Sequence, residues 1–398
     1  MRPVRVLAIT KIFPNAAEPL SAPFNRQQFA ELGKLCDLEV LATIPWFPGA
    51  SLLSRWSSAG KVAAVPRQEI IEGLSVRHPR TLFVPRVAHV TWGPLYAASL
   101  MPHWLRYRGK VDVVLGSWAY PDGFAAIAFA EALGVPAVVK LHGSDINVNA
   151  EMPGPRRLLS WALPRARKVV AVSRELARRV GELGVPQERI AIVGNGIDSS
   201  LFCVRSRAEA RLRCQLTEAP TIVYVGNLKE EKGVLDLADA FAQLAQQHPT
   251  ARLVLVGGGP AKAALEARLA GLGDRVTLAG PQELSEIPWW MAAADVVTLA
   301  SWNEGTPNVL LEALACGRRV VATRVGGVPD VVTSPIQGEL VEARAPATLA
   351  EALSRALATP YDPDRVASSR SGASWAASAS ALHRVLVEAS EAYEAWEP

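Results

Sequence analysis

The sequence is poor in cysteine and has no long apolar run. Its four cysteines lie far apart, and none of them forms a CxxC pair. This spacing argues against a disulfide framework and a zinc cluster, and a reducing cytoplasm is the expected compartment. The apolar stretches 124–130 and 135–139 fall far short of the ~20 residues that a membrane-spanning helix needs. The stretch 6–10 is also too short for a signal-peptide core and predicts a first strand.

The remaining composition is that of a folded chain with more than one domain. Apolar residues make up 49% of the 398 residues, which excludes intrinsic disorder. At ~150 residues per domain, this length predicts two or three domains.

The charge is divided unevenly. Residues 1–198 hold 24 Lys+Arg and 15 Asp+Glu, a balance of +9, and the remaining 18 and 23 give −5 for residues 199–398. A basic half is expected to meet something anionic, such as nucleic acid or a membrane surface. Ordinary arginine-rich surface chemistry explains the excess equally well at this point.

Strand and helix signals alternate along the chain. Short β-branched runs predict strands at 4–10, 111–116, 135–141, 168–172, 189–193, 221–225, 252–256, 275–279, 296–300, 319–323 and 339–341. Segments with helical spacing predict helices at 25–35, 123–133, 174–183, 234–247, 261–269, 286–293, 307–315, 346–357 and 375–396. Strands that are apolar on both faces and alternate with helices indicate parallel sheets covered on both sides.

The pattern pauses at the polar, arginine-rich stretch 198–220 and then restarts. We therefore predict an α/β chain of two doubly wound domains, 1–198 and 199–374. The last helix, within 375–398, has no strand after it and is expected to cross back to the first domain. Ligands of such sheets bind beyond the carboxyl ends of the strands, so a site in the cleft between the two domains is expected.

The strand 221–225 ends in Gly226-Asn227, and Lys232 follows just before the helix at 234. Gly226 would let a ligand approach the backbone closely. A lysine at a helix N-terminus works against the helix dipole, which favours an anionic ligand there. The alternative is a surface lysine paired with Glu230 or Glu231.

The segment 301–313 follows a predicted strand and carries the sharpest polar pattern. Thr306 is a suitable N-cap, and Pro307 suits the first helical position. The N–H groups near Asn308 and Val309 would then be free to hold a phosphate or sugar oxygen. The carboxylates of Glu304 and Glu312 in this segment are better suited to accept hydroxyl hydrogen bonds than to meet phosphates. An exposed glutamate without a ligand is the simpler alternative.

These motifs together resemble a known family. The pair Glu304 and Glu312, with the core EGTPNVLLEA, is similar to the signature of the retaining nucleotide-sugar glycosyltransferases of family 4. The stretches VVAT (320–323), GGVPD (326–330), NGID (195–198) and LHGSD (141–145) agree with it, and the start of the chain is similar to members that build bacterial surface polysaccharides. The resemblance covers nearly the whole chain and implies the GT-B architecture of two Rossmann-like domains.

The resemblance implies roles for the second-domain residues. Glu312 would hold the ribose hydroxyls of the nucleotide, Glu304 the hydroxyls of a hexose-type donor sugar, and Lys232 the diphosphate. The donor-binding set would be completed by Gly226, Asn227, Gly305, Thr306, Asn308 and Val309. The family usually has an arginine where this chain has Asn227, which removes one cation unless Lys229 or Arg324 replaces it. The resemblance implies no cofactor and no metal, and no DxD-like acidic pair stands at a strand end.

In the first domain, which would bind the acceptor, the resemblance places His142 near the anomeric centre. Asp145 would orient it or cap the following turn, and Asn25 and Arg26 would complete the acceptor side. With Lys232 and Glu304, His142 forms the predicted catalytic set. Because no carboxylate is suited to act as nucleophile, a front-face reaction on one side of the sugar fits better than a covalent intermediate.

The basic excess of the first domain coincides with aromatic residues on predicted helices. The set is Arg86, Trp92, Tyr96, Met101, Trp104, Leu105, Arg106, Tyr107, Arg108 and Lys110, followed by Arg156, Arg157, Trp161, Arg165, Arg167 and Lys168. Such surfaces suit peripheral attachment to the inner face of an anionic membrane, where a saccharide or polyprenyl-linked acceptor would be within reach. A buried aromatic core with solvated arginines is the alternative, and no nucleic-acid recognition motif is present.

Two other functions stay open at this point. A sugar-nucleotide epimerase shares the two-domain architecture, but it would not need the Glu304 and Glu312 pair. A catalytically weak or silent sugar-binding member is compatible with Asn227.

Overall fold

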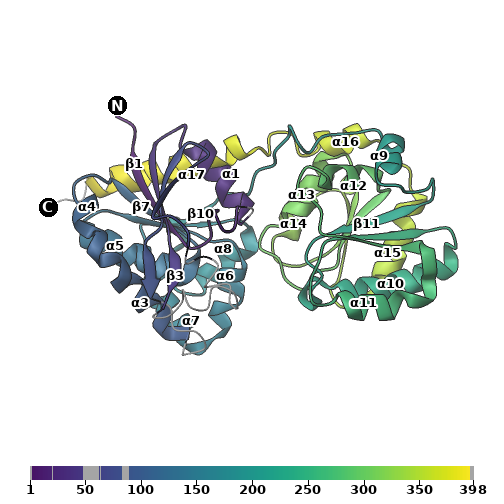
Figure 1. Cartoon of the computed structure of the whole chain (residues 1–398), viewed down its shortest axis with the longest axis horizontal. Helices are drawn as coiled ribbons and strands as arrows, with labels where there is room; N and C mark the ends of the chain where they lie inside the picture. Colours follow the sequence, from purple (N-terminus) through teal and green to yellow (C-terminus); the bar gives the residue numbers. More distant parts are fainter. Residues whose placement is uncertain (1, 20, 48–61, 63, 83–88, 395–398) are drawn as a thin grey trace. The chain divides into compact units, whose positions relative to one another are not determined.

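The computed structural model describes residues 2–19, 21–47, 62, 64–82 and 89–394. Arg86 of the basic-aromatic set and Trp396, the predicted end of the last helix, lie outside these residues. The chain divides into two units, Met1–Gly196 with Trp375–Pro398, and Ile197–Ser374 (Figure 1). The sequence placed the boundary two residues later.

The first unit is built on an eight-stranded sheet with the order β10-β9-β8-β7-β1-β2-β5-β4. Its strands are β1 (Arg5–Thr10), β2 (Asp37–Ala42), β4 (Gln68–Ile71), β5 (Leu74–Arg77), β7 (Val113–Ser117), β8 (Ala137–Lys140), β9 (Lys168–Ala171) and β10 (Ile190–Ile192). A small separate sheet pairs β3 (Ile44–Trp46) with β6 (Arg80–Leu82).

The predicted parallel arrangement holds for the first sheet except at one edge. β4 and β5 pair antiparallel, and they are joined through Glu72 and Gly73, which have φ values of 51° and 79°. Two consecutive residues with positive φ form the turn that matches the twist of a two-residue hairpin. β5 alternates apolar and polar residues, with Leu74 and Val76 buried, but a run of four residues is a weak signal of a strand.

Helices cover both faces of the first sheet (Figure 1). They are α1 (Pro23–Leu32), α3 (Trp92–Leu100), α4 (Trp104–Tyr107), α5 (Phe124–Leu133), α6 (Ser144–Asn147), α7 (Pro153–Ala162), α8 (Arg174–Gly181) and α17 (Trp375–Glu394). Leu7 of β1 belongs to the core that contains α5, whereas Val6 faces the opposite core, to which Leu382 of α17 contributes. The prediction that the last helix returns to the first domain is thus confirmed, and α17 packs against α1.

The second unit has a fully parallel six-stranded sheet with the order β13-β12-β11-β14-β15-β16. Its strands are β11 (Thr221–Val225), β12 (Arg252–Val256), β13 (Val276–Gly280), β14 (Val296–Leu299), β15 (Val320–Thr323) and β16 (Gly338–Val341). Its helices are α9 (Arg207–Arg213), α10 (Val234–Gln247), α11 (Lys262–Leu269), α12 (Ile287–Ala293), α13 (Asn308–Ala315), α14 (Val328–Val331), α15 (Pro346–Ala358) and α16 (Pro363–Ser368). The order reverses between β11 and β14, where a ligand site is expected beyond the strand ends.

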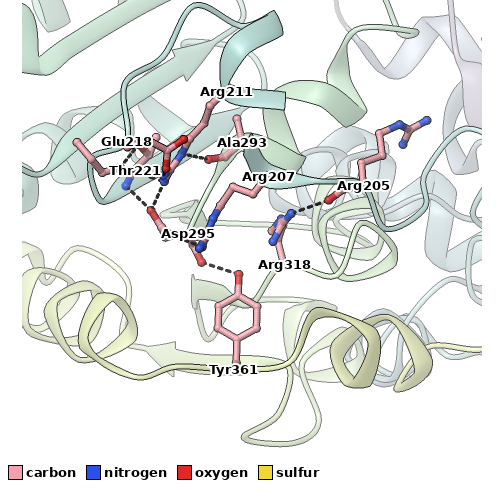
Figure 2. Close-up of polar contacts among 10 residues, drawn as sticks. Arg205, Arg207, Arg211, Glu218, Thr221, Ala293, Asp295, Arg318 and Tyr361 are labelled. Atoms are coloured by element: carbon pink, nitrogen blue, oxygen red, sulfur yellow. Dashed lines mark hydrogen bonds and ion pairs between the residues drawn. The ribbon is translucent and has the colours of Figure 1, made fainter. Parts of the chain in front are cut away.

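The helix α9 was not predicted, and one buried side chain explains why it forms. Arg211 is 5% exposed and donates to the carbonyls of Ala293 and Ala219 and to Asp295 Oδ2, the last at 2.7 Å (Figure 2). Asp295 Oδ2 also accepts from the backbone N–H of Thr221 at 2.7 Å. Tertiary hydrogen bonds therefore hold a seven-residue helix that is too short to be stable alone.

The basic-aromatic set of the first unit divides between core and surface. Tyr96 and Tyr107 are 5% and 3% exposed and belong to the core, as the alternative interpretation held for them. Leu105 and Trp161 are 74% and 47% exposed. The arginines and lysine with exposed side chains are Arg106, Arg108, Lys110, Arg156, Arg157 and Arg165.

Candidate functional site

The loops at the carboxyl ends of β14 and β15 pack closely in the second unit. Gly326, with φ +50°, sits where a Cβ atom would lie 1.8 Å from the carbonyl oxygen of Glu304. Similarly, a Cβ on Gly233, with φ +62°, would lie 1.9 Å from the carbonyl oxygen of Ala300. Only glycine permits both the left-handed backbone and the close approach. The GGVPD motif thus holds the backbone of Glu304 in place.

Replacing Gly326 with alanine is expected to lower the free energy of unfolding by about 3 kcal/mol, because overpacking and the left-handed backbone both oppose a Cβ atom. Denaturant titration measures this loss. Gly271 is the matched control, since a Cβ there meets nothing within 4 Å. Equal losses in the two alanine variants would refute the packing role of Gly326.

Two residues that lie 72 positions apart in the sequence form an ion pair beyond the carboxyl ends of β11 and β14. Lys232 Nζ lies 2.7 Å from Glu304 Oε1, and the Ser301 hydroxyl donates to the same oxygen at 2.6 Å. The side chain of Glu304 is 10% exposed and that of Lys232 is 30% exposed. Lys232 therefore does not pair with Glu230 or Glu231 as the alternative held, and its ammonium lies beside the predicted sugar-binding carboxylate.

Trp302 joins the two loops that carry this pair, and the sequence analysis missed it. Its indole N–H donates to Asp236 Oδ2 of α10 at 2.6 Å, and its backbone N–H donates to the Glu231 carbonyl at 3.0 Å. The guanidinium of Arg344 lies 4.2 Å from the indole centroid. These contacts fix the loop of Glu304 against the loop of Lys232.

The start of α13 differs by one residue from the prediction. The helix begins at Asn308, and Pro307 occupies the N-cap position with φ −77° and ψ 93°. Thr306 as N-cap and Pro307 as first helical residue are therefore wrong. The prolyl ring fixes φ at a value that suits both the N-cap position and the first helical position. The sequence therefore did not distinguish these two positions for Pro307. Gly305 and Val309 flank this start and are half-buried.

Glu312 lies one turn further along α13, on the face shared with Asn308. Its side chain is half-buried. Burial raises the pKa of the Glu312 carboxyl to about 7. Hydrogen bonds from hydroxyl groups would stabilise the ionised carboxylate at this half-buried position, because they replace the water that burial removes.

The strand end at β11 carries Gly226 and Asn227 as predicted. The side chain of Asn227 is exposed, and its carbonyl accepts from the Tyr224 hydroxyl at 2.8 Å. The cations considered as replacements for the missing arginine, Lys229 and Arg324, are also exposed. Lys229 lies 3.8 Å from Glu231 and Arg324 lies 3.7 Å from Glu342.

In the first unit, a chain of hydrogen bonds leads to His142 at the end of β8. The Asn25 side-chain N–H donates to the Ile12 carbonyl, so its oxygen is the atom that accepts from Ser117 Oγ, at 3.0 Å. Ser117 Oγ also lies 2.9 Å from His142 Nε2. Because the Ser117 proton is directed to Asn25, Nε2 must be the donor, and Nδ1 of the neutral ring is left as an acceptor. Asn25 is 0% exposed and acts on His142 only through Ser117.

The His142 ring lies between two aromatic rings that the sequence analysis did not select. Phe24 is 4.8 Å away and tilted by 44°, and Trp118 is 5.9 Å away and stacked at 25°. Burial, together with the nearby Lys140, holds the pKa of His142 well below its ordinary value. The imidazole is therefore neutral at pH 7. The sequence spacing does not predict this arrangement, because Phe24 lies at the start of α1 and Trp118 directly follows β7, far apart in the chain.

Asp145 and Arg26 have partners within the protein, and their place on the acceptor side stays a prediction. Asp145 is 0% exposed and accepts backbone N–H bonds from Ala119, His142 and Gly143 at 2.7–3.2 Å. It thereby holds the backbone of His142, in line with the predicted orienting role, whereas the N-cap of the following helix is Gly143 with no side-chain cap. Arg26 lies 3.8 Å from Glu72 of the hairpin.

Among the residues that the structure describes, no three His, Cys, Asp or Glu side chains gather as a metal site. The expectation of a metal-independent reaction stays a prediction.

The comparisons with known proteins agree with this architecture. The family profile "Glycosyltransferase Family 4" matches residues 57–201, and "Glycosyl transferases group 1" matches residues 219–359. Two crystal structures share the fold at 19% identity. They are Alr3699/HepE of Anabaena in complex with UDP, with a TM-score of 0.69 over 98% of this chain and 100% of that one, and the sucrose-phosphate synthase of Thermosynechococcus elongatus, with 0.73 over 98% of each. The fold is GT-B, as predicted.

Two curated relatives extend over most of the chain. A putative teichuronic acid biosynthesis glycosyltransferase of Bacillus subtilis, TuaC, is 31% identical over 88% of this chain and 89% of its own length. The D-inositol 3-phosphate glycosyltransferase 1 of Catenulispora acidiphila is 30% identical over 87% and 83%. With similarity of this extent on both domains, the chain belongs to glycosyltransferase family 4.

Proposed function

We propose that this glycosyltransferase moves a hexose-type sugar from a nucleoside-diphosphate sugar to a saccharide or lipid-linked acceptor, with retention of the anomeric configuration. The observation that carries the proposal is the Lys232–Glu304 ion pair, 2.7 Å long. It lies at the carboxyl ends of the strands, where α13 with the half-buried Glu312 also begins. The fold neighbour HepE binds UDP and UDP-glucose, which supports a nucleotide-sugar donor. The relative TuaC supports a role in surface polysaccharide synthesis.

Each carboxylate would meet one part of the donor. Glu312 accepts the ribose hydroxyls, and Glu304 accepts hydroxyls of the sugar. Lys232 turns from Glu304 Oε1 toward the diphosphate, while Ser301 keeps its hydrogen bond to Glu304. A cation placed where negative charge develops stabilises the transition state more than the ground state. Lys232 would therefore assist departure of the nucleoside diphosphate.

We place the reaction on one face of the sugar. The acceptor hydroxyl oxygen bonds to the anomeric carbon as the bond to the β-phosphate oxygen breaks, and the hydroxyl proton passes to that leaving oxygen. His142 Nδ1 would accept a hydrogen bond from a sugar hydroxyl, since the Nε2–H group is directed to Ser117. No covalent enzyme intermediate is formed.

A panel of nucleotide sugars tests this proposal. Wild-type chain is incubated with each donor and a mixture of lipid-linked and soluble saccharide acceptors, and release of nucleoside diphosphate is followed. At least one donor is expected to turn over, and Glu312→Ala is expected to lose that turnover. Donor binding without transfer or hydrolysis in the wild type would instead support the silent sugar-binding alternative. Interconversion of the free donor would support the epimerase.

We further propose that the exposed part of the basic-aromatic set attaches the first unit to an anionic membrane. The Arg165 guanidinium lies 4.0 Å from the ring centroid of the exposed Trp161, and Arg156 and Arg157 of α7 are exposed nearby in sequence. A cation and an aromatic ring together suit the interface of a bilayer. No helix among the residues described by the structure is long and apolar enough to span a membrane.

Changing Arg156, Arg157 and Arg165 together to glutamine is expected to weaken binding to phosphatidylglycerol vesicles by about 100-fold, at ~1 kcal/mol per charge. Vesicle sedimentation at low and high salt measures the change. The control changes three exposed arginines of the second unit, Arg213, Arg268 and Arg355. Equal vesicle binding by both variants would contradict the attachment surface.

A further inference from the structure

A cavity of about 550 Å³ opens at the edge of the second sheet that the proposed donor site does not use. Asp295 directly precedes β14, and Arg318 lies two residues before β15, so the cavity is at the amino ends of the strands. It is lined by Arg205, Ser206, Arg207, Asp295, Arg318, Ala356, Leu357, Thr359, Pro360, Tyr361 and Pro363. Three of these residues carry positive charge, and one carries negative charge.

The single carboxylate of the cavity is engaged by two arginines and a backbone N–H. Asp295 Oδ1 pairs with Arg207 at 2.5 Å, and its Oδ2 accepts from Arg211 and from the backbone N–H of Thr221 (Figure 2). The Tyr361 hydroxyl donates to the Asp295 carbonyl at 2.8 Å, which places the phenol ring at the cavity wall. Asp295 is thus already shared by two arginines, Arg207 and Arg211, which together offset its charge.

Arg318 is a further arginine of the cavity. It is 2% exposed, and among the residues described by the structure its Nη2 donates only to the Arg205 carbonyl, at 3.2 Å. Its buried Nε has no hydrogen-bond partner, and it forms no ion pair with any carboxylate in the part of the chain that the structure describes. Burying a guanidinium without an anion is costly. Arg319 and Arg370 also have a buried Nε without a partner, but both of those residues are only half-buried.

The third arginine is directed elsewhere. The guanidinium of Arg205 lies 5.0 Å from the ring of Trp289, and Figure 2 shows it pointing away from Asp295. The cavity thus presents two guanidinium groups, a half-exposed one on Arg207 and a buried one on Arg318. Planar guanidinium groups recognise phosphoryl oxygens in bidentate fashion.

We propose that this cavity is a second anion site that binds the phosphoryl group of a small phosphorylated compound through Arg207 and Arg318. Ligand cavities of 300–1,000 Å³ hold small molecules, so about 550 Å³ has room for a monophosphate with a sugar-sized body. Ser206 and Thr359 supply hydroxyls on the wall. The site does not depend on the proposed transfer reaction, because it uses none of its residues.

The test uses the full chain with Lys232→Ala, which weakens phosphate binding at the proposed donor site. Equilibrium dialysis with inorganic phosphate and glucose 1-phosphate should show saturable binding to this chain. Adding Arg207→Gln should weaken that binding at least tenfold. Arg213→Gln on the same helix should leave it unchanged, because Arg213 pairs with Glu286 at 2.7 Å, outside the cavity. Arg318→Gln should abolish binding, and if that variant does not fold, Arg207→Gln carries the test.

The phosphoryl group could belong to a soluble metabolite or to a lipid headgroup. Vesicles containing phosphatidic acid distinguish these two sources. Binding of the soluble phosphates that depends on Arg207 identifies a metabolite site, and vesicle binding that depends on Arg207 identifies a lipid headgroup site. No saturable binding in the Lys232→Ala chain, or binding that Arg207→Gln leaves unchanged, would overturn the proposal.

Discussion

Replacing Lys232 with alanine is expected to lower kcat by about 100- to 1,000-fold. The ammonium of Lys232 would offset the charge that develops on the departing diphosphate, and removing one such group costs this much in other enzymes. KM for the donor should rise far less, because the ground state is held by several groups. Steady-state kinetics with the donor identified in the panel measures both constants.

Two variants at the same place provide the controls. Glu304→Gln keeps a hydrogen-bond acceptor for the sugar and should cost less, about tenfold. Lys232→Arg keeps the charge and should recover part of the loss. If Lys232→Ala and Glu304→Gln both turn over at the wild-type rate, the site is wrongly assigned.

The second large effect is a dependence on pH through Glu312. Burial raises the pKa of its carboxyl to about 7, above the value in the unfolded chain. The native state therefore gains stability below about pH 4.3, and this gain is lost as the pH rises through 7. At pH 8, Glu312→Gln should exceed the wild type in free energy of unfolding by up to about 3 kcal/mol, and the difference should shrink toward pH 5.

Nucleotide binding should follow the opposite trend. The ionised carboxylate offers both oxygens as acceptors, whereas the neutral carboxyl carries a proton on one of them. The affinity of the wild type for nucleotide should therefore rise as the pH approaches 7 and level off above it. In Glu312→Gln it should be weaker and lack this rise. Glu283→Gln, an exposed glutamate of the same unit, is the control. Between pH 5 and 8, the free energy of unfolding and the nucleotide affinity of the wild type could vary in the same way as those of Glu312→Gln. This result would contradict the assignment of Glu312.

Much of the fold was predictable from apolar runs. The elements β11, β12 and α10 begin and end as predicted, because glycine or proline lies at or close to their ends in the sequence. β2 and the β4–β5 hairpin were missed, although apolar and polar residues alternate in residues 38–40 and in β5, because such short runs are weak signals of a strand. The helix α9 was missed because buried contacts of Arg211 hold it, and such contacts have no local pattern.

The candidate site was predictable to a different extent in the two units. In the second unit, short motifs identify Lys232 and Glu304, although only the fold reveals that they pair. In the first unit, Asn25 and Asp145 were predicted on the acceptor side. The structure shows hydrogen bonds of their side chains with Ser117 and with loop amides. Such partners lie far away in the sequence and cannot be predicted from it, and the acceptor-side role stays a prediction.

The most direct test of the central claim is NMR of one reaction mixture, with the donor and acceptor found in the panel. The phosphorus spectrum should show nucleoside diphosphate appearing at the rate of product, and the anomeric proton of the product should keep the donor configuration. Both signals should be lost in Lys232→Ala within the same time. A product of inverted configuration, or undiminished transfer in Lys232→Ala, would contradict the proposed reaction.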